Sequence, residues 1–116
     1  MKVLLVYGAH VDVYSALKAL NKPTDFMPIP IIFLRKEEGL SETALKSERI
    51  LVITTPGPGE RGKVWDLVEK AVEQARNAGK DLIVIEAAWE EPLKRYAKLA
   101  DYVFIEGQLF ERRERA

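Results

Sequence analysis

The sequence contains no cysteine and a single histidine, His10. The absence of cysteine excludes disulfide bonds, thiolate zinc sites, iron–sulfur clusters and a cysteine nucleophile. One histidine also excludes any metal site built from several histidines of the same chain. Any bound metal would have to be a hard cation held by carboxylates. We expect neither a metal site nor a cofactor.

The chain also lacks a net charge and a long apolar run. Lys plus Arg number 18 and Asp plus Glu number 18, so the overall charge does not favour nucleic acid or an anionic membrane. The apolar run Val3–Val6 is too short for a signal-peptide core or a membrane span, which predicts a cytoplasmic protein without a membrane partner. The many Lys, Glu and Arg residues, beside few Asn and Gln, are typical of a thermophilic source.

The chain length and the pattern of apolar runs predict one α/β domain over residues 1–116, with 111–116 as a frayed charged tail. Five short apolar runs do not alternate with polar residues, which is typical of strands buried on both faces of a parallel sheet. Pro28 and Pro30 cannot donate to a strand ladder, so the second strand should start late or lie at an edge. The runs are Val3–Val6, Ile31–Leu34, Ile50–Ile53, Leu82–Ile85 and Tyr102–Ile105.

Helical patterns lie between these runs. One helix follows the first strand, with Asp12 placed to cap its start. A long helix should run from about Glu60 to Ala78, and a short one should follow Glu91 with Pro92 at its first position. Residues 37–48 predict a turn or two of helix. The alternation predicts a doubly wound open sheet of the Rossmann or flavodoxin kind, with about five mainly parallel strands and helices on both faces.

In such sheets, ligands bind beyond the carboxyl ends of the strands, where the strand order reverses. The segments that should gather there are residues 7–12, 54–59 and 86–90, together with Glu106. They supply the predicted ligand-binding residues, which are Thr54, Thr55, Gly57, Gly59, Lys63 and Trp89.

Residues 57–64, GPGERGKV, fit the first seven positions of the phosphate-loop pattern G-x-x-x-x-G-K-[ST]. Val64 stands where a hydroxyl would hold magnesium, and Pro56 and Pro58 remove backbone N–H groups that cradle phosphate. This argues against a nucleotide triphosphatase. Two interpretations stay open: a stiff structural turn, and anion binding at the helix N-terminus with Lys63 nearby but without hydrolysis.

Residues 6–17, VYGAHVDVYSAL, and 50–60, ILVITTPGPGE, resemble a Toprim domain, the magnesium-binding module of topoisomerases and primases. The resemblance covers about residues 2–85. It aligns Tyr7 with the family's acid/base Glu, and Thr55 and Gly57 with its metal-binding Asp residues. Asp12 matches in kind, one position further along. The resemblance therefore implies a domain that has lost its metal chemistry.

Two side chains near the first strand could transfer protons. His10 is the only histidine of the chain and could form an acid/base pair with Asp12, which is close in sequence. A plain surface histidine is the alternative. The acids Glu86, Glu90, Glu91 and Glu106 could hold a hard cation if they converge, but charged loop residues are usually solvated, and this is what we expect of them. Tyr14 and Trp65 flank the apolar stripes of their helices, and such boundary aromatics predict a homodimer contact.

The sequence supports two hypotheses of different classes. The first is a non-catalytic binding or interaction module that recognises a phosphate-containing or anionic ligand at the carboxyl edge of the sheet. The alternative is a small enzyme that acts on a phosphorylated or anionic metabolite, with His10 and Asp12 beside the glycine loop of residues 57–63. The missing acids favour the first, because an enzyme needs groups for proton transfer and charge stabilisation.

Overall fold

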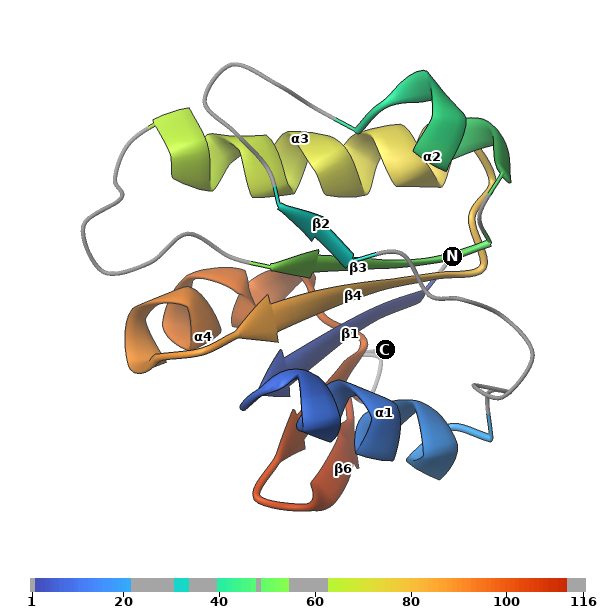
Figure 1. Cartoon of the computed structure of the whole chain (residues 1–116). Coiled ribbons are helices and arrows are strands. Elements are labelled where there is room, and N and C mark those ends of the chain that lie inside the picture. Colours follow the sequence, from blue (N-terminus) through green and yellow to red (C-terminus); the bar gives the residue numbers. More distant parts are fainter. Residues whose placement is uncertain (1, 22–30, 34–39, 48, 55–62, 113–116) are drawn as a thin grey trace.

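A computed structural model describes residues 2–21, 31–33, 40–47, 49–54 and 63–112, with the backbone alone for 31–33, 47 and 63–65. One mixed sheet of six strands has the order β2-β3-β4-β1-β5-β6 (Figure 1). All five predicted strands are present, and the predicted fold class is confirmed. The strands are β1 (Lys2–Tyr7), β2 (Ile31–Phe33), β3 (Ile50–Thr54), β4 (Leu82–Ala87), β5 (Tyr102–Ile105) and β6 (Gln108–Glu111).

Strands β1 to β5 pair with one another only in parallel, and β6 pairs antiparallel with β5. Strand β6 was not predicted from the sequence, because its residues follow β5 closely and resemble part of a polar tail. Glu106 and Gly107 form the connecting turn with φ of 51° and 78°, the geometry of a tight two-residue hairpin. Glu111 belongs to this strand and not to the predicted tail, while 113–116 fall outside the described residues. The second strand does begin after Pro30 and lies at a sheet edge, as predicted.

Helices connect the parallel strands. Helix α1 begins at His10, so Asp12 is not its N-cap residue: that position is Ala9, and Asp12 lies in the first turn. Helix α4 begins at Glu90, which places Pro92 third and not first in the helix. The elements are α1 (His10–Ala19), α2 (Glu42–Ser47), α3 (Lys63–Asn77), α4 (Glu90–Tyr96) and the 3₁₀ turn η1 (Ala97–Leu99).

The sheet separates two apolar clusters. Residues of α3, α4 and η1 pack with Val3, Leu5, Ile83 and Ile85 on one face, and α2 covers the same cluster. Helix α1 packs on the other face against Leu4, Val6 and other strand residues. Figure 1 shows α1 on one side of the sheet, away from α2 and α3. Because consecutive strand residues point to opposite faces, a continuous apolar strand fills both clusters.

The strand order reverses around β1. Strand β1 connects through α1 to β2, at the edge beyond β3 and β4. Strand β4 connects through α4, over the other face, to β5 on the opposite side of β1. The connections that leave the neighbouring strands β1 and β4 therefore diverge to opposite faces. In open α/β sheets this divergence opens the crevice where ligands bind.

Candidate functional site

The side chains of His10 and Glu86 meet at this point of divergence. His10 is the first residue of α1, and Glu86 is the next-to-last residue of β4. The Nδ1 atom of His10 contacts Oε2 of Glu86. The contact links a helix start on one connection to a strand end on the other.

The two partners differ greatly in exposure. Glu86 exposes only 5% of its side-chain surface, whereas His10 exposes 46%. A buried carboxylate needs a partner, since an unpaired charge in an apolar environment is costly. His10 supplies one, and its ring also reaches the surface. The pair thus places an oriented imidazole where a ligand can approach it.

The register explains why Glu86 points towards α1. Glu86 is paired with Val6 of β1 and with Thr54 of β3, so all three side chains lie on the same face. Val6 belongs to the apolar cluster beneath α1. The next residue, Ala87, is buried in the cluster on the opposite face. A shift of one residue in the β4 register would turn the carboxylate away from His10.

The turn before α1 is shaped by Gly8 and Asp12. The Asp12 carboxylate accepts a hydrogen bond from the backbone N–H of Ala9, at 2.8 Å from Oδ2 to N. Gly8 has φ of 153°, and a Cβ atom there would lie 2.2 Å from the same oxygen. Gly8 N–H also donates to the Ala87 carbonyl, at 3.1 Å, which ties the turn to the end of β4. Asp12 therefore shapes the start of the helix, and the carboxylate that contacts the His10 ring is that of Glu86.

Two backbone N–H groups of this helix start are available to a ligand. The amides of Asp12 and Val13 donate to the Ala9 carbonyl. Those of His10 and Val11 donate to no acceptor within the described part of the chain. The first amides of a helix lack intrahelical acceptors, and the helix dipole adds a partial positive charge there. An anionic group beside the His10 ring could accept from them.

Thr54 adds a hydroxyl group on the same face of the sheet. It ends β3 directly beside Glu86 in the register. Its Oγ1 is buried and has no hydrogen-bond partner among the residues that the structure describes. Buried hydroxyls are usually paired, so this one is notable beside a candidate site.

Trp89 lies just past the end of β4, where it is the N-cap residue of α4 and is half-buried. It lines an open hollow of about 350 Å³ together with Glu90, Glu91 and Lys94. Lys94 and Glu90 form an ion pair at 3.1 Å. The predicted position of Trp89 at the carboxyl edge is consistent with this arrangement.

Much of the predicted glycine-loop site cannot be compared with the structure. Thr55, Gly57, Gly59 and the side chain of Lys63 fall outside the described residues, and so does the side chain of Trp65. Of the positions aligned with the functional residues of the Toprim family, Tyr7 and Asp12 are described. Tyr7 ends β1 and packs against the cluster on the α3 and α4 face, opposite to Glu86.

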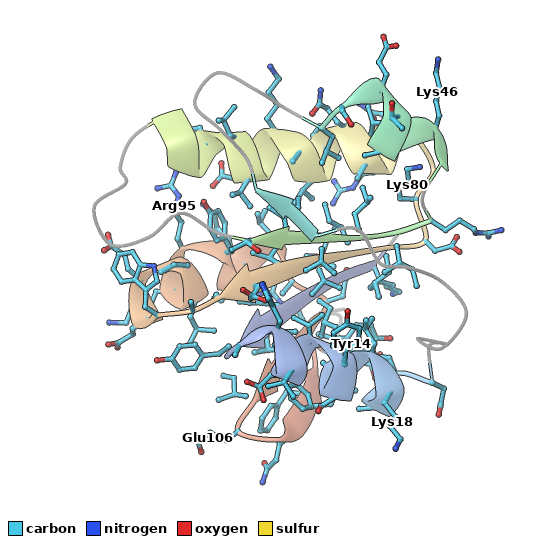
Figure 2. All side chains as sticks on the ribbon, in the orientation of Figure 1. Tyr14, Lys18, Lys46, Lys80, Arg95 and Glu106 are labelled. Atoms are coloured by element: carbon cyan, nitrogen blue, oxygen red, sulfur yellow. The ribbon has the colours of Figure 1, made fainter. Side chains whose placement is uncertain are left out.

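From the sequence, Glu86 was expected to be solvated, and no contact with His10 was predicted for it. The structure contradicts that expectation, because Glu86 is 4% exposed. The available signal was its position, directly after four apolar residues of a buried strand. Glu90 and Glu106 are exposed, as expected, and Glu106 lies at the tip of the β5–β6 hairpin (Figure 2).

Within the described ranges, no group of three or more His, Asp or Glu side chains could hold a metal ion. None of the helices described there is long and apolar enough to cross a membrane. A scan against protein-family models finds no match, and searches of curated proteins and solved structures find none either.

Proposed function

We propose that this domain is a small enzyme that transfers a proton on an anionic metabolite bound over the carboxyl ends of β1 and β4. His10 is the proton-transferring group, and Glu86 is the residue that positions it. The observation that carries the proposal is the contact between His10 Nδ1 and the buried Glu86 carboxylate. This revises the pair expected from the sequence, since Glu86 takes the role given there to Asp12.

A carboxylate beside one imidazole nitrogen has two chemical effects. It accepts a hydrogen bond from the Nδ1–H group, which leaves Nε2 as the nitrogen that can take a proton from a ligand. It also stabilises the imidazolium that forms after this transfer. Because Glu86 sits on a central strand, the ring orientation is fixed by the sheet and not by a loop.

The ligand class follows from the groups around the ring. The N–H groups of His10 and Val11, which have no acceptor in the described ranges, are donors, and the Thr54 hydroxyl can donate as well. An oxyanion of a carboxylate or phosphate would satisfy such donors. The nearby carboxylates of Asp12 and Glu86 limit the affinity, so binding should be modest and sensitive to salt.

The pair can be tested by nitrogen-15 NMR, because His10 is the only histidine and its ring signals need no assignment. In the neutral ring we expect the proton on Nδ1. Glu86→Leu removes the acceptor while it fits the apolar face beside Val6, and it should move the proton population towards Nε2. Asp12→Asn serves as the matched control and should leave the tautomer unchanged. An unchanged tautomer in Glu86→Leu would show that Glu86 does not orient the ring.

Catalysis needs a separate test. A mixture of phosphate esters and carboxylic acids would be incubated in deuterium oxide with the wild type and with His10→Gln. Mass spectrometry would follow deuterium gain and new products. We expect conversion that depends on His10 and falls by about 10²–10⁴-fold in the variant, the usual contribution of general acid–base catalysis. Equal results for both proteins would leave no support for an enzyme.

A non-catalytic anion-binding module is the second candidate, favoured by the two free amides at the start of α1. Inorganic phosphate would then shift the His10 ring signals without any conversion of the mixture above. The glycine loop is tested in the same titration at low ionic strength. Lys63→Ala should weaken binding and Glu60→Gln should strengthen it if that loop takes part. Absence of binding in all three proteins would remove this candidate.

We also propose that the Toprim resemblance marks a domain without that family's metal chemistry. Tyr7, Thr55 and Gly57 supply no acid at the aligned positions. Millimolar magnesium should therefore leave the melting temperature unchanged, and neither DNA cleavage nor ATP hydrolysis should occur. Metal-dependent turnover that disappears in Glu86→Gln would contradict the proposal.

A further inference from the structure

The outer edge of β6 exposes backbone groups that are able to pair with another strand. Strand β6 is the last strand of the sheet, next to β5 alone (Figure 1). The Arg112 N–H donates to the Asp101 carbonyl at 2.7 Å. In an antiparallel ladder, hydrogen-bonded pairs alternate with non-hydrogen-bonded pairs. Because Arg112 and Asp101 form a hydrogen-bonded pair, the alternation places Phe110 and Gln108 in hydrogen-bonded pairs with β5. The N–H and C=O groups of Leu109 and Glu111 then point outwards.

The side chain at the centre of this edge is apolar. Phe110 is 52% exposed, and it is one of three exposed large hydrophobic residues in the described part of the chain, with Val11 and Tyr14. It shares a face with Val103, which packs against the cluster beneath α3 and α4. An exposed aromatic on an open edge strand is a common feature of strand-pairing surfaces.

Residues 108–111 also lack three features that often prevent such pairing, which are Lys, Pro and a bulge. Natural edge strands carry Lys, Pro or bulges that block a further strand. Residues 108–111, QLFE, contain neither Lys nor Pro, and their register with β5 is continuous, without a bulge. At the other edge of the sheet, β2 has only three residues and follows two prolines. The two edges therefore differ in their capacity to pair.

We propose that β6 pairs antiparallel with β6 of a second copy of this chain, about a two-fold axis at Phe110. In this register Leu109 lies opposite Glu111 of the other copy, and these two residues exchange both of their outward hydrogen bonds. Phe110 meets Phe110 of the second copy in the closely spaced, non-hydrogen-bonded position, where side chains contact best. Both sheets join into one continuous sheet across the axis.

Alternative two-fold registers are less favourable. An axis at Glu111 would place two carboxylates directly opposite each other. An axis at Leu109 would pair Phe110 with Gln108 and leave the aromatic ring without an aromatic partner. The register at Phe110 avoids both outcomes. Because a four-residue strand covers little area, the dimer should be weak and concentration-dependent.

The homodimer contact predicted from Tyr14 and Trp65 is a different surface. Tyr14 is 45% exposed on α1, while the Trp65 side chain is outside the described residues. Nothing in the described geometry makes that surface complementary to itself, whereas the β6 edge is self-complementary in its hydrogen bonds. The β6 surface is also independent of the proposed activity of His10.

The test is sedimentation equilibrium of the full chain at concentrations up to the millimolar range. We expect a reversible dimer for the wild type. Glu111→Pro removes an outward N–H that makes no bond to β5, and it should weaken the dimer by at least about tenfold. Glu111→Ala, the matched control, keeps that N–H and should retain the dimer. Phe110→Lys places two cations at the axis and should also give monomers, without touching the backbone.

Three results would overturn the proposal. One is a monomeric wild type at every concentration. Another is a dimer that both Glu111→Pro and Phe110→Lys leave intact. The last is a dimer lost only in Tyr14→Ser, which would locate the contact on α1. Circular dichroism of each variant confirms that any loss of dimer does not follow from unfolding, and Phe110→Lys decides the matter if Glu111→Pro fails to fold.

Discussion

The two faces of β4 at its carboxyl end have opposite characters. Ile85 points into the cluster covered by α3, α4 and η1, where the fully buried Tyr96 also lies. Glu86, the next residue, points towards the face covered by α1 and contacts His10 there. The face beneath several helices is closed by apolar packing. On the other face α1 starts at His10, so the strand end is completed by polar groups, and this is where a ligand can bind.

The largest effect on stability is expected from a substitution in the apolar cluster that α3, α4 and η1 cover. Ile85→Ala removes a fully buried side chain and should lower the free energy of unfolding by about 2–5 kcal/mol. Urea denaturation measures this change. Val11→Ala, at a residue that is 68% exposed on α1, should change it by less than about 0.5 kcal/mol. Similar costs for the two variants would contradict the described packing.

The next largest effect is expected from a substitution in the turn before α1, on the face of the sheet where His10 and Glu86 meet. Gly8→Ala adds a Cβ atom 2.2 Å from the Asp12 carboxylate, at a backbone conformation that favours glycine. It should destabilise the fold by about 1–3 kcal/mol. Gly79→Ala is the matched control, because its φ is also positive at 72° but no atom lies within 4 Å of the added Cβ. In the double variant with Asp12→Ala, part of the Gly8→Ala cost should disappear, and full additivity would argue against the contact.

A smaller effect is expected on the pH dependence of stability, and it comes from Tyr96 on the face covered by α3, α4 and η1. Burial raises the pKa of the Tyr96 phenol above its ordinary value of 10.0. Below pH 10 the phenol is neutral in both states, so stability is unaffected. Above pH 10 the unfolded chain loses this proton while the folded chain keeps it, and stability should fall by up to about 1.4 kcal/mol per pH unit.

Thermal unfolding of the wild type and Tyr96→Phe between pH 9 and about 11 measures this contribution. The variant should lose stability less steeply with rising pH. The nearby Arg95 (Figure 2), which bonds to Asp66 of α3 at 2.8 Å, lowers the pKa of the phenol through its charge and so opposes part of the effect of burial. Parallel pH profiles would indicate that Tyr96 ionises as readily in the folded protein as in the unfolded one.

The sequence by itself determined the five parallel strands and their helices. Runs such as Leu82–Ile85 contain no polar residue, and only a strand covered on both faces can bury them completely. The prolines before β2 likewise determined its late start and edge position, because proline cannot donate to a ladder. These features depend on local composition, so they can be predicted without knowledge of the tertiary structure.

Only the tertiary structure decided which carboxylate contacts His10. Asp12 is two residues away along the chain, yet its carboxylate is engaged by Ala9, while Glu86 is brought from 76 residues away. That contact depends on β1 and β4 being neighbours and on the register that turns Glu86 towards α1. Strand order and register arise from the packing of the whole sheet, and no short stretch of the sequence specifies them. For the same physical reason, the β6 hairpin and its outward-facing amides became apparent only once the partner of β5 was known.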